Sequence, residues 1–269
     1  METTQVFFLA IIQGLTEYLP ISSSAHLILP SQLLGWPDQG LAFDVAVHIG
    51  SLLAVCTYFR HELQLIFSSC WAQLFQGQSN EHSRLGWLLI FGTIPVGLAG
   101  LLFDDFIENH LRSIMVIALT TIIFGLLLGL VDKKGSQQLT MEQMGWRSAM
   151  LIGLSQALAL IPGTSRSGIT ITAALALGYD RQSAARFSFL LAIPVIILSG
   201  GYKGLQLFGE HNSVVWGDIL LGVGLSAVTA FMCIHFFLAL VNRIGMMPFV
   251  WYRLILGGYL CTLLINGTS

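Results

Sequence analysis

The sequence predicts an all-α polytopic membrane protein with six transmembrane helices and two re-entrant helical hairpins, arranged as an inverted repeat. Hydrophobic residues make up 55% of the 269 positions and charged residues only 10%, whereas a soluble domain carries about 25% charge. The mean hydropathy is +0.77. Long apolar stretches recur along the whole chain, and two shorter ones stop at a proline that is followed by a turn rich in hydroxyl groups.

Six apolar stretches are predicted to span the membrane. Three of them contain no Asp, Glu, Lys or Arg over 19 to 23 residues, which is long enough to cross about 30 Å of hydrocarbon as a helix. The other three are shorter or carry one charged residue, so we expect them to line something polar. The first three are Leu85–Phe103, Ser113–Val131 and Ile219–Val241, and the others are Leu41–Phe59, Phe187–Tyr202 and Pro248–Ile265.

Two further stretches, Val6–Leu19 and Ser148–Ile161, end at a proline, and each is followed by a second short apolar stretch, Leu27–Leu34 or Ile169–Leu177. None of these halves is long enough to span a bilayer. They predict two helical hairpins that enter the membrane and return on the same side, because a broken backbone is tolerated there when it is buried in protein or faces water.

The two hairpins open similar halves of the chain. Aligning Pro20 with Pro162 offsets the halves by 142 residues and predicts one membrane domain over 1–269, with repeats at about 1–131 and 146–269. The six predicted spans also divide the basic residues unequally, which sets the orientation of membrane proteins. The richer face, predicted to be cytoplasmic, has Arg60, Arg84, Lys133, Lys134, Arg147, Arg181, Arg186 and Arg243, and the other has Arg112 and Lys203.

With this topology the first hairpin enters from outside and the second from inside, so that their tips can meet near the midplane. In the first hairpin Gln13 and Glu17 lie four residues apart and therefore on one helix face. An ionisable group inside a membrane is costly and usually lines a functional site. Glu17 could hold a divalent cation that bridges phosphate oxygens, or act as a base. The alternative is a carboxylate that is hydrogen-bonded to its own hairpin.

Ser22, Ser23 and Ser24 precede an apolar stretch and could simply cap a helix. The same geometry also creates an anion site, where a serine hydroxyl could donate to a phosphate or attack it. His26 could deprotonate a serine or protonate a leaving group, because its ordinary pKa is near neutral.

Arg166 lies among small and hydroxyl residues that would let a ligand approach closely. Its guanidinium matches phosphate oxygens and stays charged when it is buried. A purely structural pair with Glu17 is the alternative. Further hydrogen-bond donors would come from Thr164, Ser165, Ser167 and Thr170.

The positions of other polar residues predict roles outside the centre of the site. We expect His48 and Ser51 to support the site indirectly, and Arg253 to extend its charge to the cytoplasmic interface. The stretch 61–75 is expected to lie along the membrane surface. The residues alone therefore predict an intramembrane site for an anionic, phosphorylated ligand, and they leave hydrolysis, transport and a non-catalytic scaffold open. We expect no nucleic-acid partner.

Two motifs add a resemblance that covers essentially the whole chain. They are Gln13-x-x-x-Glu17 followed by Leu-Pro-Ile-Ser-Ser-Ser-Ala-His26, and Pro162-Gly-x-Ser-Arg-Ser-Gly168 with Thr170. These resemble the two signatures of the bacterial undecaprenyl pyrophosphate phosphatases, also called bacitracin resistance proteins.

The resemblance implies hydrolysis of undecaprenyl pyrophosphate to undecaprenyl phosphate and inorganic phosphate, which recycles the carrier lipid for cell-wall synthesis and confers bacitracin resistance. It also implies a multi-pass protein of the bacterial inner membrane, surrounded by lipid, with its site open to the periplasm and a requirement for magnesium or calcium. We also consider a homodimer. The alternative function is an inverted-repeat transporter or flippase for the lipid carrier or another anionic substrate.

The resemblance assigns roles to individual positions. Arg166 clamps the pyrophosphate, Ser23 attacks or orients it, Glu17 binds metal or acts as base, and His26 handles the leaving-group proton. The remaining substrate-binding positions are Gln13, Ser22, Ser24, Thr164, Ser165, Ser167 and Thr170.

Overall fold

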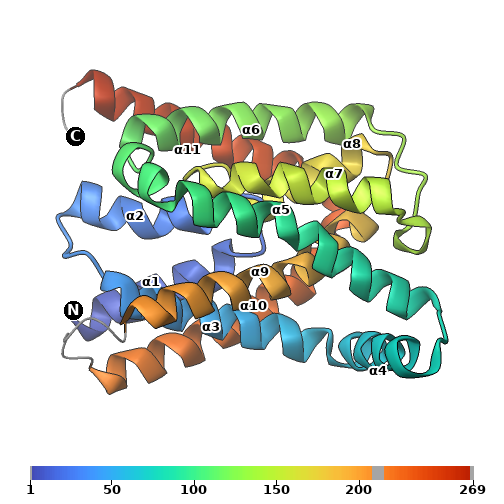
Figure 1. Ribbon diagram of the computed structural model, residues 1–269. Helices are drawn as coiled ribbons and strands as arrows, with labels where there is room; N and C mark the ends of the chain where they lie inside the picture. The colour runs from blue at the N-terminus through green and yellow to red at the C-terminus, as the bar shows by residue number, and fades with distance from the viewer. Residues whose placement is uncertain (1, 208–214, 267–269) are drawn as a thin grey trace.

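The computed structural model describes residues 2–207 and 215–266, and this part of the chain is helical with no strand. Figure 1 shows its elements packed as one bundle. They are α1 (Thr3–Thr16), α2 (Ser23–Leu34), α3 (Gly40–Tyr58), α4 (Arg60–Gln76), α5 (Glu81–His110), α6 (Ile114–Lys134), η1 (Met141–Gln143), α7 (Trp146–Ala157), η2 (Leu158–Leu160), α8 (Arg166–Ala176), α9 (Arg181–Leu207), α10 (Trp216–Ile244) and α11 (Met247–Ile265). The prediction of an all-α protein is confirmed.

Six of these helices are long and apolar enough to cross a membrane, namely α3, α5, α6, α9, α10 and α11. Each contains one of the predicted spans or nearly coincides with it, so the six predicted transmembrane helices are confirmed. Helix α5 has 30 residues and α10 has 29. At 1.5 Å per residue they are about 45 Å long and reach beyond the hydrocarbon layer.

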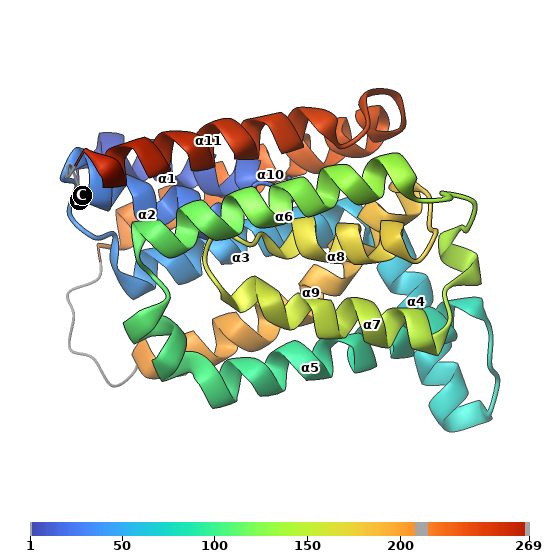
Figure 2. The same ribbon diagram turned by 90° about the horizontal axis from the view of Figure 1, so that it is seen from above.

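The two predicted hairpins are the helix pairs α1–α2 and α7–α8. These helices contain only 11 to 14 residues each and measure about 17–21 Å, too short to span. Figures 1 and 2 show the first pair entering from the end of the bundle that holds the N-terminus and the second pair from the opposite end, with both turns inside the bundle. The arrangement is therefore inverted, as predicted.

The returning helices begin after equivalent turns of different length. Helix α2 begins at Ser23 and α8 begins at Arg166, which is an offset of 143 residues instead of the 142 that aligned the prolines. The reason is that two residues separate Pro20 from α2, whereas three separate Pro162 from α8. The residue before each start has a positive φ, 75° at Ser22 and 72° at Ser165. The alignment is therefore short by one residue at the point where the helices restart.

Helix α4 is the predicted surface stretch. It lies at the end of the bundle opposite the N-terminus, where Figure 1 shows it nearly end-on and Figure 2 shows it crossing the direction of the bundle. Phe67, Trp71 and Phe75 form a ladder of ring contacts along one side and are 72%, 55% and 67% exposed. An exposed apolar stripe on such a helix suits the membrane interface.

Glycines allow several helices to approach closely, as is common inside membranes. At Gly153 in α7 an added Cβ would lie 2.2 Å from the carbonyl oxygen of Gly92 in α5, and at Gly14 in α1 it would lie 1.8 Å from Oγ1 of Thr229 in α10. Helix α7 of the second hairpin therefore packs directly on α5, and helix α1 of the first hairpin packs directly on α10.

We expect Gly153→Ala to lower the free energy of unfolding by about 1–3 kcal/mol, because the new methyl group forces α7 away from α5. The measurement is the midpoint of thermal unfolding in detergent. Gly224→Ala in α10 is the control, since a Cβ there meets no atom within 4 Å. Equal midpoints for the two variants would contradict the close packing of α7 on α5.

Candidate active site

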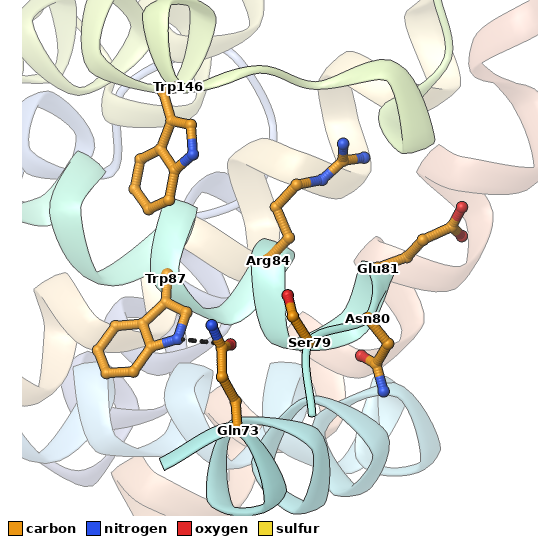
Figure 3. Close-up of a pocket in the computed structure, with 7 residues that line it drawn as sticks. All are labelled: Gln73, Ser79, Asn80, Glu81, Arg84, Trp87 and Trp146. Atoms are coloured by element: carbon orange, nitrogen blue, oxygen red, sulfur yellow. Dashed lines mark hydrogen bonds between the residues drawn. The ribbon is translucent and has the colours of Figure 1, made fainter. Parts of the chain in front are cut away.

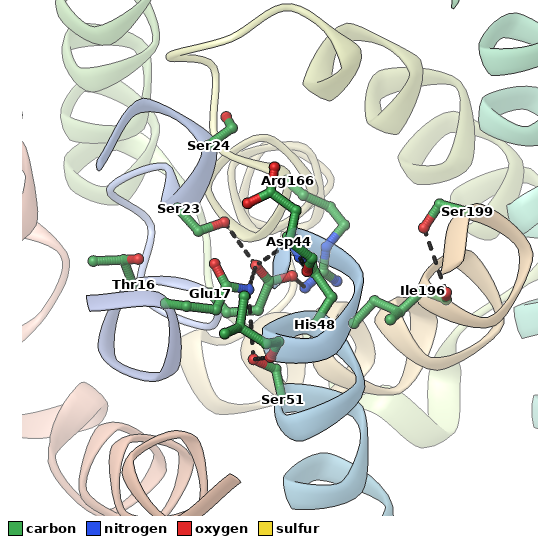
Figure 4. Close-up of polar contacts among 12 residues, drawn as sticks. Thr16, Glu17, Ser23, Ser24, Asp44, His48, Ser51, Arg166, Ile196 and Ser199 are labelled. Carbon is green, nitrogen blue, oxygen red and sulfur yellow. Dashed lines mark hydrogen bonds and ion pairs between the residues drawn. The ribbon is translucent and has the colours of Figure 1, made fainter. Parts of the chain in front are cut away.

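Glu17, which directly follows α1, is the centre of a buried polar cluster (Figure 4). Its side chain is 5% exposed. One carboxylate oxygen, Oε1, accepts a hydrogen bond from Nη2 of Arg166 at 3.0 Å. The other, Oε2, accepts from the Ser23 hydroxyl at 2.6 Å and from Nε2 of Gln13 at 2.9 Å. The structure thus brings four predicted site residues together from both hairpins.

The two turns present these groups at the starts of short helices. Ser23 is the first residue of α2 and Arg166 is the first residue of α8, and the preceding residues hold a left-handed backbone that costs about 1–3 kcal/mol for a non-glycine residue. The Ser165 hydroxyl caps α8 by accepting from the backbone N–H of Gly168. Ser22 makes no such cap. The start of α2 therefore keeps its positive end for an anion.

Several buried polar atoms of the described residues have no hydrogen-bond partner. They include Nη1 of Arg166, Oε1 of Gln13 and Oγ1 of Thr164. An unpaired buried donor on a charged group is costly, and an incoming phosphate oxygen would satisfy it. Arg166 thus has one nitrogen for the protein and one for a ligand, which its planar fork permits.

His48 and Ser51 in α3 contact the cluster directly. Nε2 of His48 lies 3.7 Å from Oε2 of Glu17, while its Nδ1 donates to the carbonyl oxygen of Asp44 at 2.7 Å. Oγ of Ser51 accepts from Nε2 of Gln13 at 3.5 Å. Figure 4 shows His48, Ser23 and Arg166 around Glu17. These contacts are consistent with the predicted supporting role of His48 and Ser51, and they arise because α3 packs against the first hairpin.

His26 has other partners than predicted. Its Nδ1 lies 2.7 Å from the carbonyl oxygen of Ser22, and its Nε2 lies 2.5 Å from the hydroxyl of Tyr252 in α11. The two rings stack with an interplanar angle of 16°. The ring nitrogens are therefore engaged by the turn and by α11, and the proton-transfer role of His26 stays a prediction.

Comparison with known proteins shows the family of the chain. A model of the family described as bacitracin resistance protein BacA matches residues 6–259. The chain belongs to the bacitracin resistance protein family. The undecaprenyl-diphosphatase of Teredinibacter turnerae is 60% identical over 257 residues, which cover 96% of this chain and 97% of that protein. Proteins of the same name from Saccharophagus degradans and Chromohalobacter salexigens are 57% and 58% identical and cover 98% and 96% of this chain, and 98% and 97% of their own lengths.

Most hydroxyl groups of the second hairpin that were predicted to bind substrate are hydrogen-bonded to backbone groups of the protein. Ser167 donates to the carbonyl oxygen of Leu19 at 2.8 Å and so joins the two hairpins. The Thr170 hydroxyl contacts the carbonyl of Arg166 and the hydroxyl of Ser188. In the first hairpin, Ser24 is exposed and lies within hydrogen-bonding distance of Ser22. Thr164 and Gln13 keep unpartnered oxygens, so they are better placed than Ser167 or Thr170 to contact a ligand.

Arg253 is the most consequential residue that the sequence analysis misplaced. It is completely buried, so the expectation that it reaches the cytoplasmic interface is wrong. Its guanidinium donates to five backbone carbonyls, those of Pro20 in the first turn, Gly163 and Thr164 in the second, and Thr120 and Thr121 in α6. A lone arginine within a short apolar span was the available signal, because such a charge must find acceptors inside the protein.

A separate hollow of about 470 Å³ lies at the far end of the bundle, beside α4. Figure 3 shows its lining. Trp87 donates to Oε1 of Gln73 there, and tryptophans are enriched at membrane interfaces. The predicted catalytic residues are not among its lining, which consists of Gln73, Ser79, Asn80, Glu81, Arg84, Trp87 and Trp146. The buried Glu17 cluster is therefore the better candidate for the active site.

We expect Arg253→Met to lower activity by about tenfold or more and to lower thermal stability as well. The reason is that five buried carbonyls lose their charged donor, and leaving a buried polar group unpaired costs about 1–3 kcal/mol of folding free energy. Phosphate release and thermal unfolding in detergent measure the two effects. Arg243→Met, at an exposed position at the end of α10, should stay within about twofold of wild type. Wild-type activity in Arg253→Met would show that its bonds to the two turns are not needed for the site.

Proposed function

We propose that this multi-pass membrane protein hydrolyses undecaprenyl pyrophosphate to undecaprenyl phosphate and inorganic phosphate, and so returns the carrier lipid to cell-wall synthesis. The observation that carries the proposal is the buried contact of Glu17 with both Arg166 and Ser23, in which Nη1 of Arg166 remains without a partner. The names of the relatives, which cover nearly the whole chain, support the same activity.

The contacts suggest how phosphoryl transfer proceeds. Ser23 donates its hydroxyl hydrogen to Glu17 at 2.6 Å, so Glu17 can take the proton while the oxygen of Ser23 attacks the terminal phosphorus. The bond between this phosphorus and the bridging oxygen breaks, and its electron pair leaves with undecaprenyl phosphate. Water then attacks the phosphoserine, releases phosphate and restores the serine. Glu17 acts as general base in this scheme.

Arg166 would bind the negatively charged oxygens of the phosphoryl group that is transferred. In phosphoryl transfer most of the catalysis comes from positioning and from neutralising the negative charge of the phosphoryl oxygens. The groups that would donate to these oxygens are the free Nη1 of Arg166, the start of α2 and the hydroxyl of Thr164. The unpartnered amide oxygen of Gln13 can only accept, so it would meet bound water. The hydroxyls of Ser22 and Ser24 lie at the same helix start.

A divalent cation, magnesium or calcium, fits the donor set. A carboxylate has about four acceptor positions, and Glu17 uses three of them. Within the described residues no group of three or more His, Cys, Asp or Glu is placed so that it could hold a metal ion. Magnesium is commonly held by one or two carboxylates together with substrate phosphates. Glu17 would hold the ion here, and the ion would supply positive charge that neutralises the phosphate groups.

We further propose that the first hairpin enters from the periplasmic side of the inner membrane. The basic residues near α4, the α6–α7 connection and the α10–α11 turn outnumber those of the opposite end, and such an excess marks the cytoplasmic side. Undecaprenyl pyrophosphate would then reach Ser23 from the outer leaflet. A homodimer stays a prediction, which light scattering of the detergent complex would test.

Replacing the central residues should remove the activity. We expect Arg166→Ala, Glu17→Gln and Ser23→Ala each to lower phosphate release from a polyprenyl pyrophosphate by about a hundredfold or more, because each removes transition-state charge stabilisation, the base or the nucleophile. Arg147→Ala, at an exposed position in α7, is the control and should match wild type. Release of no phosphate by wild-type protein would favour a transporter, whereas full activity of the three variants would refute the site.

Removing divalent cations should stop phosphate release, and magnesium or calcium should restore it, because Arg166, already paired with the negative Glu17, cannot balance the pyrophosphate charge alone. Binding is checked independently by thermal unfolding. A cation together with a non-hydrolysable pyrophosphate analogue should raise the midpoint of wild-type protein and leave that of Glu17→Gln unchanged. Full activity in excess chelator would contradict the cation requirement.

A further inference from the structure

The contacts of His26 define its protonation pattern. The carbonyl oxygen of Ser22 can only accept, so the hydrogen of the neutral ring lies on Nδ1, which faces that oxygen at 2.7 Å. Nε2 then carries a lone pair and accepts from the hydroxyl of Tyr252 at 2.5 Å. Both nitrogens are therefore occupied by the protein, and neither is bonded to Ser23 or Glu17.

The proposed reaction does not require a proton from His26. The leaving group is a phosphate monoester, whose second pKa is about 6, so it can depart as an anion at neutral pH. A ring that is held at both nitrogens is better suited to fixing structure than to exchanging protons. The question is then which part of the site the ring fixes.

The ring holds the residue that precedes the proposed nucleophile. Ser22 has a left-handed φ of 75°. Its carbonyl oxygen accepts two hydrogen bonds from His26, one from Nδ1 of the ring and one from the backbone N–H. The next residue is Ser23. Tyr252 connects this ring to α11, where the adjacent Arg253 donates to the carbonyl of Pro20. Helix α11 therefore holds the first turn at two points.

We propose that Tyr252 and His26 form a brace that sets the position of Ser23, so that both are positioning residues and His26 transfers no proton in the reaction. This proposal rests on the proposed function, because it concerns the same serine. The hydrogen bond from Tyr252 keeps the ring in the one tautomer that can donate to the carbonyl of Ser22.

The experiment measures kcat and KM for phosphate release from a polyprenyl pyrophosphate, in detergent with magnesium, across the neutral pH range. We expect Tyr252→Phe, which keeps the stacked ring and loses the hydroxyl, to lower kcat about two- to tenfold with KM nearly unchanged. The control Tyr259→Phe, at an exposed position of the same helix, should match wild type.

Two changes at His26 separate the brace from proton transfer. Asparagine can place its amide N–H near the position of Nδ1, so His26→Asn should keep more than about a tenth of the activity and the wild-type pH profile, whereas His26→Ala should lose more. The double variant His26→Asn, Tyr252→Phe should be no worse than His26→Asn alone, because Tyr252 acts through the ring.

Other results would overturn the brace. A loss of about a hundredfold or more in His26→Asn, together with loss of one limb of the pH profile, would identify His26 as a proton donor or base. Equal activities of Tyr252→Phe and Tyr259→Phe would show that Tyr252 positions nothing. Wild-type protein and Arg166→Ala are measured alongside, because failure of wild type to release phosphate refutes the proposed function and leaves the brace variants to be judged by their thermal unfolding.

Discussion

The buried ion pair between Glu17 and Arg166 is the constraint on which the rest of the structure depends. A single buried charge inside a membrane protein is costly, and breaking such a pair leaves the partner uncompensated. The two residues are 149 positions apart and each lies at the interruption of a re-entrant helix pair. Their pairing therefore requires hairpins from opposite ends of the bundle to meet inside it.

Where the two turns meet, some polar groups hold the turns in place, and others remain free to bind a ligand. Arg253, Ser167 and the ring of His26 are bonded to backbone carbonyls of the two turns, and such bonds can maintain the strained conformations at Ser22 and Ser165. Nη1 of Arg166 and the oxygen of Thr164 have no such partner. Catalysis that relies on positioning needs both kinds of group, since an unsupported turn would not hold Ser23 beside Glu17.

Sequence reasoning succeeded where neighbours in the chain carry the information. The spacing of Gln13 and Glu17 predicts a shared helix face, and both side chains do meet in one cluster. It failed for Arg253 and did not identify the partner of His26, because these contacts join distant segments of the chain. Tyr252 lies 226 positions from His26, and no local periodicity relates the two. The one-residue shift between the hairpins likewise arises from the lengths of the two turns.

The sequence by itself determined that the chain is a membrane protein with six spans and two interrupted helices. It also determined which polar residues lie within the membrane. These properties follow from the transfer free energy of contiguous segments, which depends on local composition. Only the tertiary structure decided which of those polar groups meet. Helix packing sets those contacts, through close approaches such as Gly14 on α10 and Gly153 on α5, and each contact depends on the geometry of two or more elements at once.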